Sequence, residues 1–148
     1  MTQRILICCD GSERSERAVE AAAALFAPRE AVVLTIAPAM TFAESMAATT
    51  SAVPGGAFED LNMAGALDHA EAGVAHARRI GLAAEPHVAV ASTTWQGIVD
   101  VADEIDAAAI VIGSRGLRGP RELAEGSVSH DVATHSTRPV LIVPPAAP

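Results

Sequence analysis

Lysine is absent from this chain of 148 residues, so all ten of its basic side chains are arginines. This absence excludes Schiff-base chemistry through lysine and the lysine of a P-loop nucleotide site. Tyrosine is also absent, and aromatic residues make up only 3% of the sequence. Such a composition favours small side chains on closely packed helices over an aromatic β core, so we expect an α/β or all-α fold.

Positive charge is scarce as well. The chain contains ten arginines and 18 acidic residues, which gives a formal net charge of −8. Nucleic acid polymers and anionic membranes are bound through clustered positive charge, so we expect neither as a partner, whereas a small anionic ligand stays possible. No apolar run approaches the roughly 18 to 20 residues of a membrane span, and the first residues lack the pattern of a signal peptide. We therefore expect one cytoplasmic domain over residues 1–148, with its core at about 3–144.

Cysteine occurs only twice, at the adjacent positions Cys8 and Cys9. Both lie in a segment that is predicted to be a strand, where neighbouring side chains point to opposite faces. No CxxC pair accompanies them, so core packing is the preferred interpretation, with a vicinal disulfide or a metal pair as the alternative. Two free thiols fit a reducing compartment.

Short apolar runs alternate with segments of helical spacing along the whole chain. Strands are predicted at 4–9, 31–37, 84–90, 108–112 and 139–143, and helices at 12–26, 58–79, 94–104 and 127–136. Alternation of this kind implies a mostly parallel, Rossmann-like sheet that is covered by helices on both faces.

Two further expectations concern the first half of the chain. Ser12 is predicted to cap the first helix, whose buried face is predicted to include Ala18, Ala22, Leu25 and Phe26. Residues 38–57 show little periodicity and are rich in proline, glycine and small side chains. We predict a mobile surface loop there, either a variable connection or a lid.

The most specific feature follows the fourth predicted strand. Gly113 and Gly116 stand three residues apart, and Gly126 and Ser127 open the last predicted helix. Glycine lets a ligand approach the bare backbone, and the start of a helix offers unpaired N–H groups and a positive dipole end. With the hydroxyls of Ser127 and Ser129 as further donors, the pattern predicts an anion site whose natural occupant is phosphate.

This stretch resembles the nucleotide-binding motif of the universal stress protein family, in which GxxG is followed after nine residues by glycine and a serine or threonine. The resemblance extends from Asp10-Gly11-Ser12 to the closing segment 138–143. It implies a doubly wound, five-stranded parallel sheet of order 3-2-1-4-5, of the adenine-nucleotide alpha hydrolase-like type. The ligand would lie between strands 1 and 4, where the strand order reverses. The implied role is that of a small regulatory domain in a stress response.

The resemblance also implies which residues bind the nucleotide. Asp10 matches an acidic residue near the adenosine, and Ile36 and Ile112 match strand-end contacts to adenine or ribose. The implied binding set is Cys8, Cys9, Asp10, Ile36, Ile112, Gly113, Arg115, Gly116, Gly126, Ser127, Val128 and Ser129. We expect ATP as the ligand, with Mg²⁺ or Mn²⁺ held by its phosphates, and neither a catalytic residue nor a protein metal ligand.

Several alternatives stay open. Asp10 could simply begin a turn or cap the first helix, and Arg115 could be solvated and paired with a nearby glutamate. The histidine spacings suit neither a metal pair nor a general base, and Trp95 is interpreted as a hydrophobic cover.

The function implied by the resemblance also has alternatives. ATP hydrolysis is expected to be slow at most. One alternative is a weak ATPase or an enzyme that phosphorylates itself at Ser127 or Ser129. Another is a dimeric interaction module that binds AMP, a cyclic nucleotide or no nucleotide. The resemblance and the apolar edge strand at 139–143 imply a homodimer through that strand.

Overall fold

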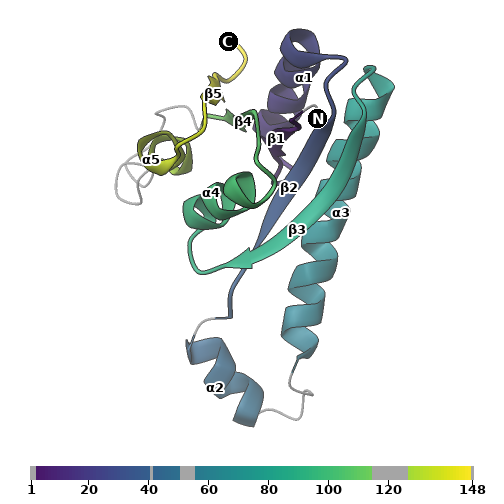
Figure 1. Cartoon of the computed structure of the whole chain (residues 1–148). Helices are drawn as coiled ribbons and strands as arrows, with labels where there is room; N and C mark the ends of the chain where they lie inside the picture. The colour runs from purple at the N-terminus through teal and green to yellow at the C-terminus, as the bar shows by residue number, and fades with distance from the viewer. Residues whose placement is uncertain (1–2, 41, 51–55, 115–126, 148) are drawn as a thin grey trace.

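The computed structural model describes residues 3–40, 42–50, 56–114 and 127–147 (Figure 1). The strands of the described residues form one sheet. They are β1 (Ile5–Cys8), β2 (Ala31–Pro38), β3 (Ala84–Ala91), β4 (Ala109–Gly113) and β5 (Val140–Val143). Their order across the sheet is β3-β2-β1-β4-β5, and every neighbouring pair is parallel, which confirms the predicted topology.

Helices cover both faces of this sheet. They are α1 (Glu13–Phe26), α2 (Phe42–Thr50), α3 (Ala57–Arg79), α4 (Thr94–Glu104) and α5 (Val128–His135). Figure 1 shows α1 and α3 on one face and α4 and α5 on the other. Ile5 and Ile7 of β1 are buried in the hydrophobic cluster with α1 and α3, whereas Leu6 is buried in the cluster with α4 and α5. Because both faces are covered, the central strands β1 and β4 are continuously apolar rather than alternating.

The start of α1 matches its prediction. Ser12 is the N-cap, and its hydroxyl accepts a hydrogen bond from the backbone N–H of Ser15 at 3.3 Å. Ala18 and Ala22 are fully buried, as predicted. Leu25 was predicted to share their buried face, but it is 64% exposed. The prediction is wrong there because Phe26, in the same last turn, supplies the contact with the core.

The predicted loop over residues 38–57 contains a helix. α2 occupies much of this segment, β2 extends to Pro38, and α3 begins at Ala57, so the prediction of an irregular loop is wrong. Alanine and methionine favour helix locally, but the segment lacks the apolar periodicity of a helix that packs on a core. Figure 1 shows why that periodicity is missing, because α2 lies beyond the sheet and covers neither face. Residues 41 and 51–55 lie outside the described residues.

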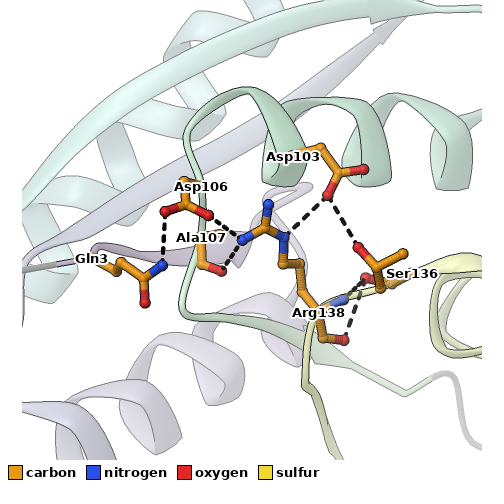
Figure 2. A network of polar contacts seen from close by, with 7 residues as sticks. Gln3, Asp103, Asp106, Ala107, Ser136 and Arg138 are labelled. Atoms are coloured by element: carbon orange, nitrogen blue, oxygen red, sulfur yellow. Dashed lines mark hydrogen bonds and ion pairs between the residues drawn. The ribbon is translucent and has the colours of Figure 1, made fainter.

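Arg138 ties the start of β5 to the end of α4 (Figure 2). Its Nε lies 3.1 Å from Oδ1 of Asp103, and the guanidinium also pairs with Asp106. Asp106 accepts a second hydrogen bond, at 2.7 Å, from Nε2 of Gln3. The bonds from Gln3 and Arg138 hold the pKa of Asp106 below its usual range, and the bonds to Asp106 and Asp103 raise the pKa of Arg138. This network lies at the amino-terminal end of the sheet, opposite the end that carries the predicted site.

Candidate functional site

A cavity of about 190 Å³ opens at the carboxyl ends of the central strands. Its lining comes from the end of β1 and the following turn, the start of α1, β2, the first two turns of α4, the end of β4 and the start of α5. The lining residues are Cys8, Cys9, Asp10, Ser12, Arg14, Ser15, Leu34, Thr35, Ile36, Thr94, Ile98, Ile112, Gly113, Ser127, Val128 and Ser129. The cavity lies where the strand order reverses between β1 and β4, which is the usual ligand position in an open α/β sheet.

The structure brings most of the predicted site residues together. Nine of them line the cavity, namely Cys8, Cys9, Asp10, Ile36, Ile112, Gly113, Ser127, Val128 and Ser129. The other three, Arg115, Gly116 and Gly126, lie outside the described residues. The described residues that converge come from four separate stretches of the chain, so their convergence is a property of the fold and not of one motif.

Seven lining residues were missed by the sequence analysis. They are Ser12, Arg14, Ser15, Leu34, Thr35, Thr94 and Ile98. Ser12 and Ser15 were detectable, because they follow Asp10 within the same turn and helix start. Thr35 was detectable as a polar residue inside an apolar strand, since such a residue needs a partner when it is buried. The remaining residues carry no comparable signal.

Asp10 is both a turn residue and part of the cavity wall. Its Oδ1 accepts a hydrogen bond from the backbone N–H of Ser12 at 3.0 Å and another from the hydroxyl of Ser12. Burial alone would raise the pKa of the Asp10 carboxyl, but the hydrogen bonds from Ser12 outweigh burial and leave that pKa below its usual value. The side chain is therefore ionised at neutral pH. It can accept hydrogen bonds from hydroxyl groups, and it repels anions.

The turn that carries Asp10 is held from three sides. The buried hydroxyl of Thr35 on β2 donates to the carbonyl of Cys9 at 2.7 Å. The thiol of Cys9 lies 3.6 Å from Oγ of Ser15 on α1 and 3.5 Å from the carbonyl oxygen of His69 on α3. Gly11 has a φ of 81°, which favours glycine, and it contacts the ring of His69. Neighbouring elements thus fix the position of the Asp10 carboxylate.

Cys8 and Cys9 contact opposite layers of the molecule, as the strand geometry predicts. Cys8 packs against the cluster beneath α4 and α5, whereas Cys9 is buried in the cluster beneath α1 and α3. Both thiols are free. Burial, followed by the nearby Cys9 and Asp10, raises the pKa of the Cys8 thiol. The interpretation of both cysteines as packed side chains is confirmed.

The start of α5 forms a polar wall of the cavity. Ser127 occupies the N-cap position of this helix, but its hydroxyl makes no capping bond to the backbone. The hydroxyl lies 2.6 Å from the hydroxyl of Ser129 instead, and this pairing takes the place of a capping bond. The first N–H groups of a helix have no partner within it, so Val128 and Ser129 present free donors and a positive dipole end at the cavity. These donors suit an anion.

The remaining wall is apolar. Ile36, Ile98 and Ile112 supply most of it, from β2, α4 and β4. α4 can approach this wall closely because position 97 is glycine. A Cβ on Gly97 would lie 3.0 Å from Cδ1 of Ile36 and 2.7 Å from Cβ of Ala91. The cavity therefore combines apolar side chains, which suit a flat ring, with N–H donors, which suit an anion.

Trp95 and the histidines lie outside this lining. The ring of Trp95 stacks on His135, with ring centroids 4.2 Å apart and the planes at 23°, and it packs on the hydrophobic cluster beneath α4. Its interpretation as a hydrophobic cover is confirmed. His69, His130 and His135 are exposed. Within the described ranges, no cluster of three or more His, Cys, Asp or Glu side chains is arranged to hold a metal ion.

The fold and the cavity define an open, doubly wound α/β domain with a cavity at its switch point. The chain matches the model of the Universal stress protein family over residues 1–144, and it belongs to that family. It is 32% identical to universal stress protein YxiE of Bacillus subtilis (strain 168), with 97% of this chain and 99% of the relative covered.

Solved structures of other universal stress proteins agree with this assignment. One from Archaeoglobus fulgidus has a TM-score of 0.72 and 30% identity, covering 97% of this chain and 99% of that one. A structure from the same organism in complex with dAMP has a TM-score of 0.68 and 29% identity, with the same coverage. A universal stress protein in complex with cAMP has a TM-score of 0.67 and 25% identity, covering 95% and 96%. In the part of this chain that the structure describes, no helix has the length and apolarity needed to cross a membrane.

Proposed function

We propose that this chain binds ATP in the cavity between β1 and β4 and acts as a nucleotide-dependent regulatory domain. The observation that carries the proposal is the convergence of Asp10, Ile36, Gly113 and the start of α5 on one cavity, whose lining combines apolar side chains with the N–H donors of a helix start. Adenine nucleotides occur in the structures of two related proteins, one in complex with dAMP and one with cAMP.

Each part of the lining has a proposed contact. Ile36 and Ile112 pack against the adenine ring, and the ionised Asp10 accepts hydrogen bonds from the ribose hydroxyls. The phosphates extend toward Gly113 and the free N–H groups of α5. Arg115, Gly116 and Gly126 belong to the same proposed phosphate side, outside the described residues.

The proposed output is binding, with slow hydrolysis at most. The described lining contains one carboxylate, Asp10, and no histidine. Mg²⁺ or Mn²⁺ would therefore be held chiefly by the phosphates themselves. A weak ATPase or a self-phosphorylating enzyme is tested by release of inorganic phosphate and by label transfer from ATP to Ser127 or Ser129.

The test compares thermal unfolding with and without Mg²⁺ and ATP, ADP, AMP or cAMP. A ligand at 100 times its dissociation constant stabilises by roughly 2.7 kcal/mol, which is readily seen. Aspartate is favoured at N-cap positions, so Ser127→Asp should be tolerated there, but it places a negative charge at the proposed phosphate side and should lose the ATP shift. Its matched control, Ser127→Asn, also caps a helix and carries no charge, so it should keep the shift.

The outcomes separate the candidate functions. Greater stabilisation by ATP than by AMP, lost only in Ser127→Asp, supports the ATP site. Equal stabilisation by AMP or cAMP would indicate a monophosphate site instead. No shift with any nucleotide would overturn the proposal and favour an interaction module.

We further propose a cytoplasmic homodimer that forms through β5. Among the described residues, β5 pairs only with β4, and Ile142 on it is 40% exposed. An apolar edge strand favours pairing with another strand. Ile142→Lys should give a monomer by light scattering and keep the nucleotide shift. Val90→Lys, at a 57% exposed valine on the opposite edge strand β3, should leave the mass unchanged. A monomeric wild type would overturn the dimer.

A further inference from the structure

We infer that Arg14 sets the preference of this site for nucleotides with more than one phosphate, by binding the terminal phosphates. This inference rests on the proposed nucleotide function. Arg14 is the second residue of α1, and it lines the cavity together with Asp10. Among the described lining residues these are the two charged side chains, and Arg14 is the positive one.

The backbone contacts of Arg14 place it at the end of β4. A Cβ built on Gly113 would lie 2.7 Å from the carbonyl oxygen of Arg14 and 3.2 Å from its Cβ. Only the missing side chain of Gly113 allows the first turn of α1 to come so close. Gly113 also begins the glycine motif that predicts phosphate binding, so Arg14 stands at the phosphate side of the cavity.

Within the described part of the chain, the guanidinium of Arg14 has no other binding partner. Other arginines there have structural partners: Arg4 pairs with Glu85, and Nε of Arg17 donates to the carbonyl of Pro144. Arg14 is exposed and has neither an ion pair nor a side-chain hydrogen bond among these residues. Its removal should therefore change ligand binding without loosening the fold.

Charge explains why such a residue would discriminate among nucleotides. The ionised Asp10 repels anions, and the donors at the start of α5 are neutral groups. Arg14 adds a full positive charge in a chain whose net charge is −8. A guanidinium binds phosphate oxygens in pairs, and its attraction grows with the charge of the phosphate chain. The effect should be absent for adenosine, small for AMP and largest for ATP.

The experiment measures the affinities of adenosine, AMP, ADP and ATP by titration calorimetry, at two salt concentrations. The proteins are the wild type, Arg14→Gln and the control Arg29→Gln, where Arg29 precedes β2 at the other end of the sheet. In Arg14→Gln we expect the ratio of ATP to AMP affinity to fall about tenfold, with adenosine unchanged and a weaker salt dependence for ATP. Arg29→Gln should match the wild type throughout, and both variants should keep the unliganded melting temperature.

Two results would overturn the inference. An unchanged ATP to AMP ratio in Arg14→Gln would show that Arg14 does not contact the terminal phosphates. An equal loss for all four ligands, including adenosine, would show that Arg14 acts on the shape of the site. In both cases the wild type still binds nucleotide, and the proposed function stands. If the wild type binds no nucleotide, the proposed function fails and the inference fails with it.

Discussion

The imidazole ring of His69 lies directly against Gly11, at the point where the chain turns from β1 into α1. A Cβ on Gly11 would stand 2.8 Å from Cδ2 of the His69 ring, and Gly11 has a φ of 81°. Two independent constraints therefore favour glycine at this position. Because Gly11 follows Asp10, the contact also links α3 to the wall of the cavity.

Replacement of Gly11 should separate these two constraints. Gly11→Ala is expected to lower the free energy of unfolding by about 1–2 kcal/mol from the left-handed backbone alone, and further because its Cβ meets His69. The double variant Gly11→Ala/His69→Ala should recover only the steric part. Urea denaturation of the four proteins in this cycle measures both. If Gly11→Ala costs the same with and without His69, the contact contributes nothing.

Two glycines on α3 should respond in opposite directions to the same substitution. Nothing lies within 4 Å of a Cβ at Gly65, so Gly65→Ala should stabilise the protein by about 0.5–1 kcal/mol through helix propensity. A Cβ at Gly73 would lie 2.8 Å from Cγ1 of Val33 and 3.0 Å from Sγ of Cys9. Gly73→Ala should therefore destabilise by about 1–3 kcal/mol through overpacking. Chemical denaturation checks both, and equal effects would contradict the packing of α3 described above.

Asp10 should make stability depend on acid pH. Its pKa in the folded protein lies below the ordinary value of 3.8, so the stability that its ionised form contributes is fully present above that value. This contribution is lost as the pH falls through the folded-state pKa. Unfolding free energies measured from about pH 6 to pH 2 should fall more steeply below about pH 4 in the wild type than in Asp10→Asn. Parallel curves over the whole range would rule out the hydrogen bonds from Ser12 as the cause.

Loss of Arg138 should loosen β5 and spare the cavity. Arg138→Gln removes the ion pairs to Asp103 and Asp106, which join the strand to the end of α4. We expect a lower melting temperature and, since β5 is the proposed dimer edge, weaker self-association on dilution. The temperature shift produced by nucleotide should stay as in the wild type, because the network lies at the opposite end of the sheet. A lost nucleotide shift would show that the two ends are coupled.

Periodicity predicted the layers of this fold well because both faces of the sheet are buried. The helix predicted at 94–104 is α4 as observed, and the other core elements differ by about one residue at their ends. Periodicity failed where an element does not pack on the sheet. α2 carries no continuous apolar face because it covers no core, so its segment resembled a loop. The prediction that Leu25 is buried failed for a related reason. Helical spacing does not show which side chain in the last turn of a helix reaches the core.

The site was predictable to the extent that its residues belong to motifs. Asp10, Gly113 and Ser127 stand at strand ends or helix starts, where ligand contacts concentrate. Arg14 lies in the first turn of an ordinary amphipathic helix, and no local pattern distinguishes it from other surface arginines. Its place beside Gly113 follows only from how α1 packs across β4, which is a relationship between distant parts of the chain.

Cys8 and Cys9 pack into opposite layers of the molecule, so their thiols can serve as two chemical probes within one chain. One sulfur is shielded by the layer of α4 and α5 and the other by the layer of α1 and α3. Alkylation of each thiol in the native protein, assigned to Cys8 or Cys9 by fragmentation of the peptide that carries both, would therefore report the opening of each layer separately at two adjacent residues. If a nucleotide rigidifies one side of the molecule more than the other, it should slow the alkylation of one thiol more than that of its neighbour.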